Sequence, residues 1–394
     1  MNRQLLLLAL CQGLFLTNNV TFIAINGLVG LSLAPFGWMA TLPVMGYVVG
    51  AAISAPLVAR LQRRHGRKRS FQWGLVVAMG SAAMCAIAVS TRQFWLLVAS
   101  TLVAGFYSAN AGLYRFAGTE LAAPAYKEKA ISLVLAGGIL GAFAGPNLAS
   151  ATRDWLAVPF AGAYVALVGV AALSLGALSL IRFPDHQAPA PGATSGRPLA
   201  TIARQPAFVV AVLGGAIGYG VMNLLMAATP IAMQQCAHPF SSAALVLEWH
   251  VLGMFVPSFF TGHLIKRVGV LPVMGVGTVL NLLCVVIALS GVDLMQFLVA
   301  LFVLGVGWNF LFTGATTLLT TTYHPDEKNK VQGAMDTCVF ATMALTSFSS
   351  GALVTTSGWT WLNLGSLLPI ALVGGALLWL AAVRRRQRSV AAAG

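Results

Sequence analysis

The sequence contains 394 residues, of which 58% are hydrophobic and only 8% are charged, and its formal net charge is +14. In soluble domains roughly a quarter of all residues are charged, so this composition excludes a water-soluble globular protein. It predicts a polytopic membrane protein in a lipid bilayer. Basic cytoplasmic loops explain the excess of positive charge, so no nucleic-acid partner is expected.

Five cysteines are scattered along the chain, without a C-x-x-C pair or a histidine cluster at metal-ligand spacing. We interpret them as buried, unreactive thiols and expect no metal or other cofactor. The N-terminus resembles a signal peptide, but its apolar run continues through Phe15 toward Gly30 without a small-residue cleavage site. This run is therefore interpreted as the first spanning helix.

Apolar stretches long enough to cross a bilayer recur along the whole chain. A hydrocarbon core about 30 Å thick needs roughly 20 apolar residues per helix. Twelve segments meet this requirement: 4–30, 36–59, 71–90, 94–117, 130–150, 157–181, 207–233, 241–265, 270–290, 294–320, 331–354 and 361–383. The predicted fold class is an all-α membrane protein with twelve transmembrane helices.

A dense basic stretch, residues 60–70 with the sequence RLQRRHGRKRS, separates the second segment from the third. It has six positive side chains and no acid. Each Arg or Lys costs about 2.5–3.5 kcal/mol at the centre of a bilayer, so we predict a cytoplasmic loop here. With both termini cytoplasmic, 20 of the 23 Lys and Arg residues fall on the cytoplasmic side. The positive-inside rule favours this orientation, and the expected location is a bacterial cytoplasmic (inner) membrane.

Residues 182–205 interrupt the apolar pattern with prolines and glycines, and we interpret them as a cytoplasmic linker. The linker separates an N-terminal six-helix bundle, residues 1–181, from a C-terminal one, residues 206–394.

The two predicted bundles share loop motifs, which indicates a duplicated unit. The motif L-x-x-R-x-G at 61–66 recurs at 264–269, and P-x-x-K-x-K at 124–129 recurs at 325–330. Such internal repeats predict a site at the interface between the two bundles.

The basic stretch resembles the loop signature G-x-x-x-D-R-x-G-R-K of the major facilitator superfamily, and the resemblance in helix number and linker covers the whole chain. The matching positions are Arg64, Gly66, Arg67 and Lys68. The first half of the signature departs, because Ala59 stands in place of the glycine and Arg63 in place of the aspartate. The resemblance implies secondary transport by alternating access, in which two helical bundles rock about a central site.

A second motif of that family, G-x-x-x-G-P on the fifth helix, is matched by Gly141, Gly145 and Pro146. In the family it is associated with antiporters, but small residues at this spacing also serve ordinary close helix packing. The arginine that the family often places in the fourth helix is absent from 101–105, and Arg115 lies further in. This departure does not favour a standard proton-exporter mechanism.

Ionisable residues inside spans are expensive and are functional candidates by default. Glu248 and His250 in the eighth segment are candidates for proton coupling, with a structural carboxyl as the alternative for Glu248. Asp336 and Arg115 lie nearer the cytoplasmic surface, where we expect gate or packing roles. Asp336 is a candidate to pair across an inner gate with a basic residue of the other half. The candidate partners are Arg60, Arg63 and Arg64.

Amide side chains at mid-helix depth form a further candidate set for the substrate cavity, although each is also suited to joining helices. They are Asn18, Asn19, Asn110, Asn223 and Asn309. In the resembled family, the first, fourth, seventh and tenth helices line the cavity. Trp308, Tyr107 and Tyr219 are candidates to stack on a planar solute, with packing as the alternative.

The sequence favours a secondary active transporter of a small organic solute and no enzyme, since it has no P-loop, H-E-x-x-H or G-x-S-x-G motif. Coupling to protons is expected, and efflux of a drug or metabolite is slightly favoured. The alternatives are proton-coupled uptake of a nutrient, such as a small metabolite or vitamin, and a non-transport receptor. We expect a monomer.

Overall fold

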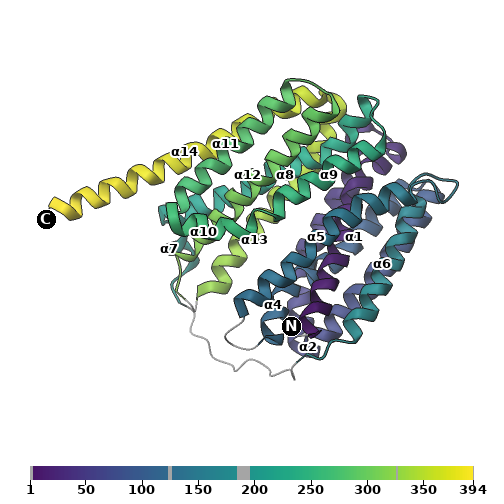
Figure 1. Ribbon diagram of the computed structural model, residues 1–394, viewed down its shortest axis with the longest axis horizontal. Helices are drawn as coiled ribbons and strands as arrows, with labels where there is room; N and C mark the ends of the chain where they lie inside the picture. The colour runs from purple at the N-terminus through teal and green to yellow at the C-terminus, as the bar shows by residue number, and fades with distance from the viewer. Residues whose placement is uncertain (1–2, 123–126, 184–195, 325–326, 394) are drawn as a thin grey trace.

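The computed structural model describes residues 3–122, 127–183, 196–324 and 327–393, and every regular element in them is helical (Figure 1). The N-terminal elements are α1 (Arg3–Leu33), η1 (Gly37–Met39), α2 (Leu42–Ser90), α3 (Phe94–Ala111), α4 (Tyr114–Leu121), α5 (Lys127–Thr152) and α6 (Ala161–Ser179). The remaining elements are α7 (Leu199–Ala203), α8 (Pro206–Gln235), α9 (Phe240–Phe255), α10 (Ser258–Val268), α11 (Val270–Leu289), α12 (Leu294–Thr320), α13 (Lys328–Thr356) and α14 (Gly358–Ala393).

The predicted all-α membrane fold is confirmed. Among the described residues, nine helices are long and apolar enough to cross a membrane, or ten if the bent pair α9 and α10 counts as one span. The count includes α2 once, although α2 contains the predicted segment 71–90 and most of the segment 36–59. The count does not include α5, which contains the predicted segment 130–150. Each of the twelve predicted segments thus falls on a helix.

Three of the predicted elements differ in their internal geometry. The basic stretch was predicted as a loop, but it is helical on both sides of Gly66. Within α2, Gly66 is the one residue whose backbone leaves helical geometry, with φ 78° and ψ 166°. The segment predicted at 94–117 breaks at Gly112 into α3 and α4. The segment predicted at 241–265 bends by 40° between α9 and α10, where Pro257 has no N–H to continue the helix.

The predicted duplication appears in the backbone. Gly269, the counterpart of Gly66, has φ 94° and ψ 161°, so both turns use the region of φ that favours glycine. Of the second predicted pair of motifs, Pro124 and Pro325 lie outside the described residues.

Each half has a hydrophobic cluster of its own, and a further cluster joins the two through residues such as Ile25 of α1 and Ile231 of α8. We call α1–α6 the N half and α8–α14 the C half. One hydrophobic cluster lies almost entirely within the N half around Phe71 and Tyr107, and another lies in the C half around Met274 and Leu311. In Figure 1 the halves converge at one end of the molecule and separate toward the end that carries the N-terminus and α7. We call the latter the linker end and the former the far end.

Contacts between the halves close the far end. The Thr41 hydroxyl, just before α2, accepts a hydrogen bond from the Gly351 N–H of α13 at 3.0 Å and donates to the Phe348 carbonyl at 3.4 Å. The rings of Phe160 and Phe240, which precede and begin helices of opposite halves, lie 4.9 Å apart. The structure therefore has its far end sealed by polar and aromatic contacts.

The described end of the linker is docked on the C half. The Glu327 carboxylate accepts hydrogen bonds from the Arg197 backbone N–H at 2.6 Å and from its guanidinium at 2.7 and 2.9 Å. These bonds, with one from the His324 N–H, hold the pKa of Glu327 well below its usual range. The ionised carboxylate therefore contributes its full stabilisation at pH values above the ordinary glutamate pKa of about 4.3. This stabilisation is lost as the pH falls through the lowered pKa of Glu327.

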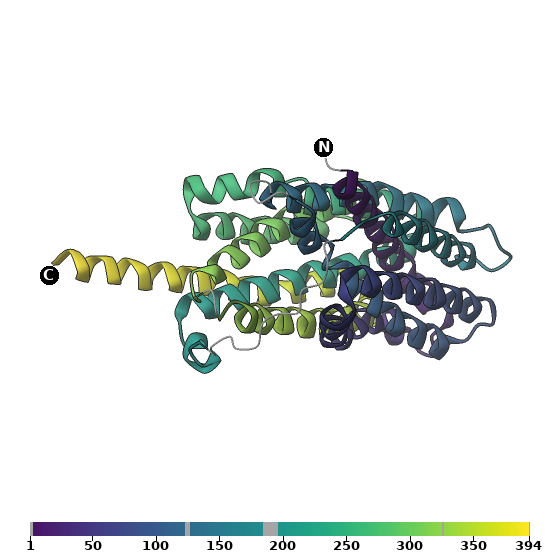
Figure 2. The same cartoon turned by 90° about the horizontal axis from the view of Figure 1, so that it is seen from below.

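The last helix is longer than predicted. The final span was expected to end at residue 383, but α14 continues to Ala393 and projects beyond the bundle (Figure 2). This projection carries Arg384, Arg385 and Arg386 away from the spans.

Candidate functional site

Four aromatic rings of the C half form a cluster at mid-helix depth. Trp308 and Phe312 on α12 stack with their centroids 5.3 Å apart and 9° between the ring planes. Tyr219 on α8 meets both rings edge-on at 5.2 and 5.3 Å, and Phe255 at the end of α9 meets Trp308 at 6.4 Å. We call these four residues the aromatic cluster. Tyr107 lies elsewhere, buried in the N half against Phe15.

The indole of Trp308 carries an unused donor. Its side chain is 7% exposed, and its Nε1 has no hydrogen-bond partner among the described residues. A buried N–H without an acceptor costs about 1–3 kcal/mol. A contact of this cluster with a planar solute stays a prediction.

A cation of the N half lies within electrostatic range of Tyr219 in this cluster. The break after α3 places Arg115 in the first turn of α4, where it is solvent-exposed, and its charge acts on the Tyr219 hydroxyl and on Asp336 of α13. Arg115 and Asp336 form no direct ion pair in the described part of the chain. Arg115 thus lies within electrostatic range of Asp336, and a pairing of Asp336 with Arg60, Arg63 or Arg64 stays a prediction.

Three of the five candidate amides join neighbouring helices. Asn110 accepts a hydrogen bond from Ser70 at 2.8 Å and donates to the Phe106 carbonyl. Asn223 donates from α8 to Ser347 of α13 at 2.9 Å. These bonds occupy the amides in this conformation, and a contact with substrate stays a prediction for them.

Asn309 occupies a position that explains the bend in the eighth span. Its amide donates to the Met254 carbonyl at 2.7 Å and to the Ser258 hydroxyl at 2.6 Å, and it accepts a hydrogen bond from Thr261 at 2.7 Å. It therefore binds both sides of the break between α9 and α10. Asn18 is buried on α1, whereas its neighbour Asn19 is half-buried.

Glu248 and His250 do not come together. Glu248 on α9 accepts a hydrogen bond of 2.9 Å from Asn147 on α5, which crosses from the N half to the C half. His250 is fully buried, with its Nδ1 2.7 Å from the Leu301 carbonyl of α12, and its Nε2 has no partner in the described residues. A joint role for the two in proton coupling stays a prediction.

The basic stretch anchors the N half at the linker end. Arg67 forms an ion pair with Glu120 of α4 at 2.6 Å, and Lys68 donates to the carbonyls of Ser179, the last residue of α6, and of Ile181 at 2.8 and 2.9 Å. These bonds tie the turn to the ends of two other spans.

The fifth-helix motif packs α5 against α1. A Cβ at Gly141 would lie 2.6 Å from the Thr17 nitrogen and 2.7 Å from the Gly13 oxygen, so the two backbones meet directly. Thr21 of α1 donates to the Gly145 carbonyl at 2.9 Å, immediately before Pro146. The contact accounts for the motif by close packing, as the sequence alternative allowed.

Sequence reasoning missed Phe255, Phe312, Asn147 and Glu120. Phe312 carried a usable signal, because it follows Trp308 by four residues and so shares its helix face. Asn147 directly follows the fifth-helix motif, but its partner on α9 is 101 residues away, and nothing local indicated that contact.

A sequence model described as the Major Facilitator Superfamily matches residues 5–247 and 211–394. The chain belongs to the major facilitator superfamily. Membership confirms the predicted resemblance, the transport class and the integral membrane character, and it agrees with the expectation that the chain is not an enzyme.

Two relatives support this assignment, and two solved structures share the fold. The chain is 38% identical to the riboflavin transporter RfnT of Brucella anthropi over 363 residues, covering 92% of this chain and 91% of the relative. It is 29% identical to the uncharacterised MFS-type transporter YdeG of Bacillus subtilis, covering 86% and 80%. The fold is similar to nucleoside transporter NupG, with a TM-score of 0.75, 12% identity and coverage of 95% and 99%. It is also similar to the human organic anion transporter MFSD10, with a TM-score of 0.68, 16% identity and coverage of 94% and 99%.

Proposed function

We propose that this transporter takes up a flavin of the riboflavin class across the cytoplasmic membrane. The observation that carries the proposal is the aromatic cluster with its unused Trp308 N–H, because a flavin offers a flat ring system edged with hydrogen-bond acceptors. The near full-length similarity to a riboflavin transporter supports the same substrate class. It favours the vitamin-uptake alternative over the efflux that the sequence slightly preferred.

The two halves supply different parts of such a site. The C half contributes the aromatic surface, and the N half contributes Arg115, whose charge reaches Tyr219. A ligand between them contacts both halves, as alternating access requires. With the far end sealed and Arg115 and Asp336 exposed, this conformation presents the site toward the linker end, which we assign to the cytoplasm.

Riboflavin uptake tests the proposal. In a bacterial host that can neither make nor import riboflavin, the parent protein should support growth on micromolar riboflavin, and the purified protein should quench flavin fluorescence. Trp308→Phe keeps an aromatic ring but removes the N–H, so flavin affinity should fall by about tenfold, which corresponds to one lost hydrogen bond. Trp361→Phe, at a residue that is 65% exposed, is the matched control and should bind like the parent. A parent protein that neither supports growth nor quenches flavin would refute the substrate class.

We further propose that uptake is coupled to protons through Glu248. This carboxyl bonds across the seam between α5 and α9, so its protonation can respond to the movement of the two halves. In proteoliposomes, Glu248→Gln should abolish accumulation driven by a pH gradient and leave flavin exchange measurable, since exchange needs no net proton movement. Asp293→Asn changes an exposed acid outside the spans and should leave both activities intact. Full gradient-driven accumulation by Glu248→Gln would assign this carboxyl to structure alone.

A further inference from the structure

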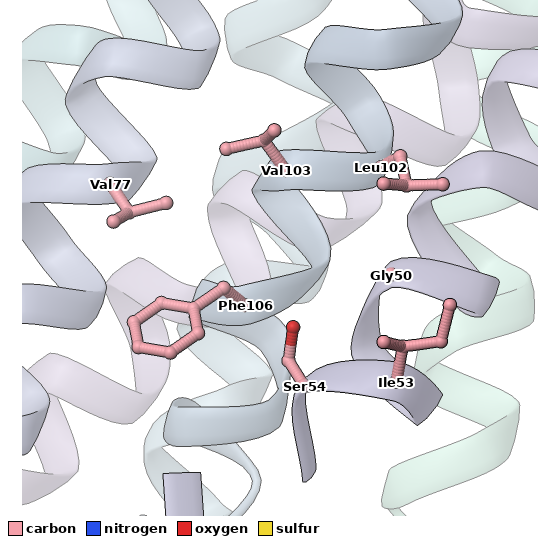
Figure 3. A pocket seen from close by; sticks show the side chains of 7 residues that line it. All are labelled: Gly50, Ile53, Ser54, Val77, Leu102, Val103 and Phe106. Carbon is pink, nitrogen blue, oxygen red and sulfur yellow. The ribbon is translucent and has the colours of Figure 1, made fainter. Parts of the chain in front are cut away.

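An apolar groove lies on the outside of the N half, away from the candidate substrate site. It has a volume of about 300 Å³ and lies between the two arms of α2, with α3 as its floor (Figure 3). The lining residues are Gly50, Ile53, Ser54, Val77, Leu102, Val103 and Phe106. Ile53 is 67% exposed and Val103 is 44% exposed. Because these exposed side chains are apolar and lie within spans, the groove faces the hydrocarbon of the bilayer.

Both walls of the groove lead to arginines at helical spacing. On the first arm of α2, Ile53 is followed by Leu57, Arg60 and Arg64 at steps of three or four residues, which places all four on one face. Leu57, Arg60 and Arg64 are exposed, and the two arginines form none of the ion pairs seen in the described residues.

The second arm of α2 repeats this pattern from the other side. Val77, Trp73 and Arg69 follow one another at steps of four residues toward the same turn. Trp73 is exposed and meets the ring of His65 edge-on at 5.0 Å. Exposed Trp beside basic residues is typical of the level of lipid headgroups.

We propose that this groove binds one anionic phospholipid, with an acyl chain between the arms of α2 and its phosphate at Arg60, Arg64 and Arg69. Charge favours an anionic lipid over a zwitterionic one, because residues 60–70 carry six positive side chains and no acid. Glu120 is already engaged by Arg67 and does not offset these three arginines.

The spacing along the helix fits a single lipid leaflet. Ser54 and Arg64 are ten residues apart, which is about 15 Å along an α-helix. This length matches half of a hydrocarbon core about 30 Å thick. A phospholipid with its phosphate beside Arg64 therefore places the end of its acyl chain beside Gly50 and Ser54, where the structure has the groove.

Lipid binding to the purified full-length protein tests this site. Phosphatidylglycerol and phosphatidylcholine with identical acyl chains are titrated against the detergent-solubilised protein, and bound lipid is counted by native mass spectrometry. The parent should retain one phosphatidylglycerol at least about tenfold more tightly than phosphatidylcholine. The combined change Arg60→Gln, Arg64→Gln and Arg69→Gln should abolish this preference.

The repeated hairpin of the C half provides the matched control. Lys266→Gln with Arg267→Gln neutralises the counterpart turn and should leave the preference unchanged. Val103→Trp fills the groove and should weaken retention of both lipids, whereas Val279→Trp, at a 61% exposed residue of α11, should not. Any one of three results would overturn the proposal. The parent could retain the two lipids equally, the Lys266 and Arg267 variant could lose the phosphatidylglycerol preference as fully as the triple arginine variant, or Val103→Trp could retain both lipids like the parent.

Discussion

Single charges at the junction of the halves act through the space between them rather than through direct contact. Arg115 and Asp336 belong to opposite halves, are both exposed at the linker end, and interact electrostatically without an ion pair. Their interaction can strengthen when the linker end closes, because opposite charges attract more strongly at shorter distance in a less aqueous surrounding.

The first prediction concerns this pair. If the two charges close the linker end together, Asp336→Asn should shift the protein toward the linker-open state, and Arg115→Gln should do the same. In a double-mutant cycle on flavin affinity the two changes should be non-additive by about 0.5–3 kcal/mol. Asp336→Asn combined with Arg64→Gln should be additive and is the matched control. Additivity in the Arg115 cycle would show that the two charges act independently.

At the scale of helices, glycines determine which spans approach most closely. On α1 and α5 the backbones meet at Gly13 and Gly141, and on α9 and α12 they meet at Gly253 and Gly305. Close backbone approach of this kind stabilises helix pairs in membranes by van der Waals packing. The α1–α5 contact belongs to the N half, and α5 in turn carries Asn147 to the seam with α9.

The second prediction follows from the α1–α5 contact. Gly141→Ala places a Cβ less than 3 Å from backbone atoms of α1, so the helices must separate. Overpacking of this kind destabilises by about 1–3 kcal/mol, and the thermal unfolding temperature in detergent should fall by several degrees. Gly169→Ala on α6, where a Cβ meets nothing within 4 Å, should leave that temperature unchanged or raise it. If the two variants changed the unfolding temperature equally, the close α1–α5 contact would not contribute specifically to stability.

The sequence predicted the spans well because hydropathy is a local property, and it failed where the outcome depends on a partner far along the chain. The turn at Gly66 and the repeat at Gly269 were visible as motifs, since a positive φ favours glycine locally. The bonds of Asn309 to α9 and α10 were not visible, because its partners lie about 50 residues away. For the same reason, the sequence named Trp308 and Tyr219 as aromatic candidates but did not show that they share one cluster.

At the scale of the whole molecule, the structure is one conformation, in which the two halves are joined at the far end. The far end is closed by contacts of Thr41 with α13 and of Phe160 with Phe240, and by a hydrophobic cluster that both halves share. Each half also has a cluster of its own. Alternating access requires the shared cluster to open at the far end, while the clusters that lie within each half can stay intact.

The last prediction concerns a disulfide that would hold the far end closed. A Cβ at Gly37 of η1 would lie 3.5 Å from the Cβ of Thr355 on α13, within the range of about 3.5–4.5 Å that disulfides adopt. The double change Gly37→Cys and Thr355→Cys should therefore cross-link the halves at the far end on oxidation. Flavin transport should fall by at least about tenfold, because the far end must open in every cycle, and dithiothreitol should restore it. Flavin binding from the linker end should survive the cross-link, since that side is already open in this state. Each single-cysteine variant, treated with the same oxidant, controls for reaction at the native thiols, including the exposed Cys338. Suppose mass spectrometry shows complete cross-linking, but the cross-linked variant transports flavin as fast as the same variant after dithiothreitol treatment. The far end then does not open during transport, and the hypothesis that the two halves rock is wrong.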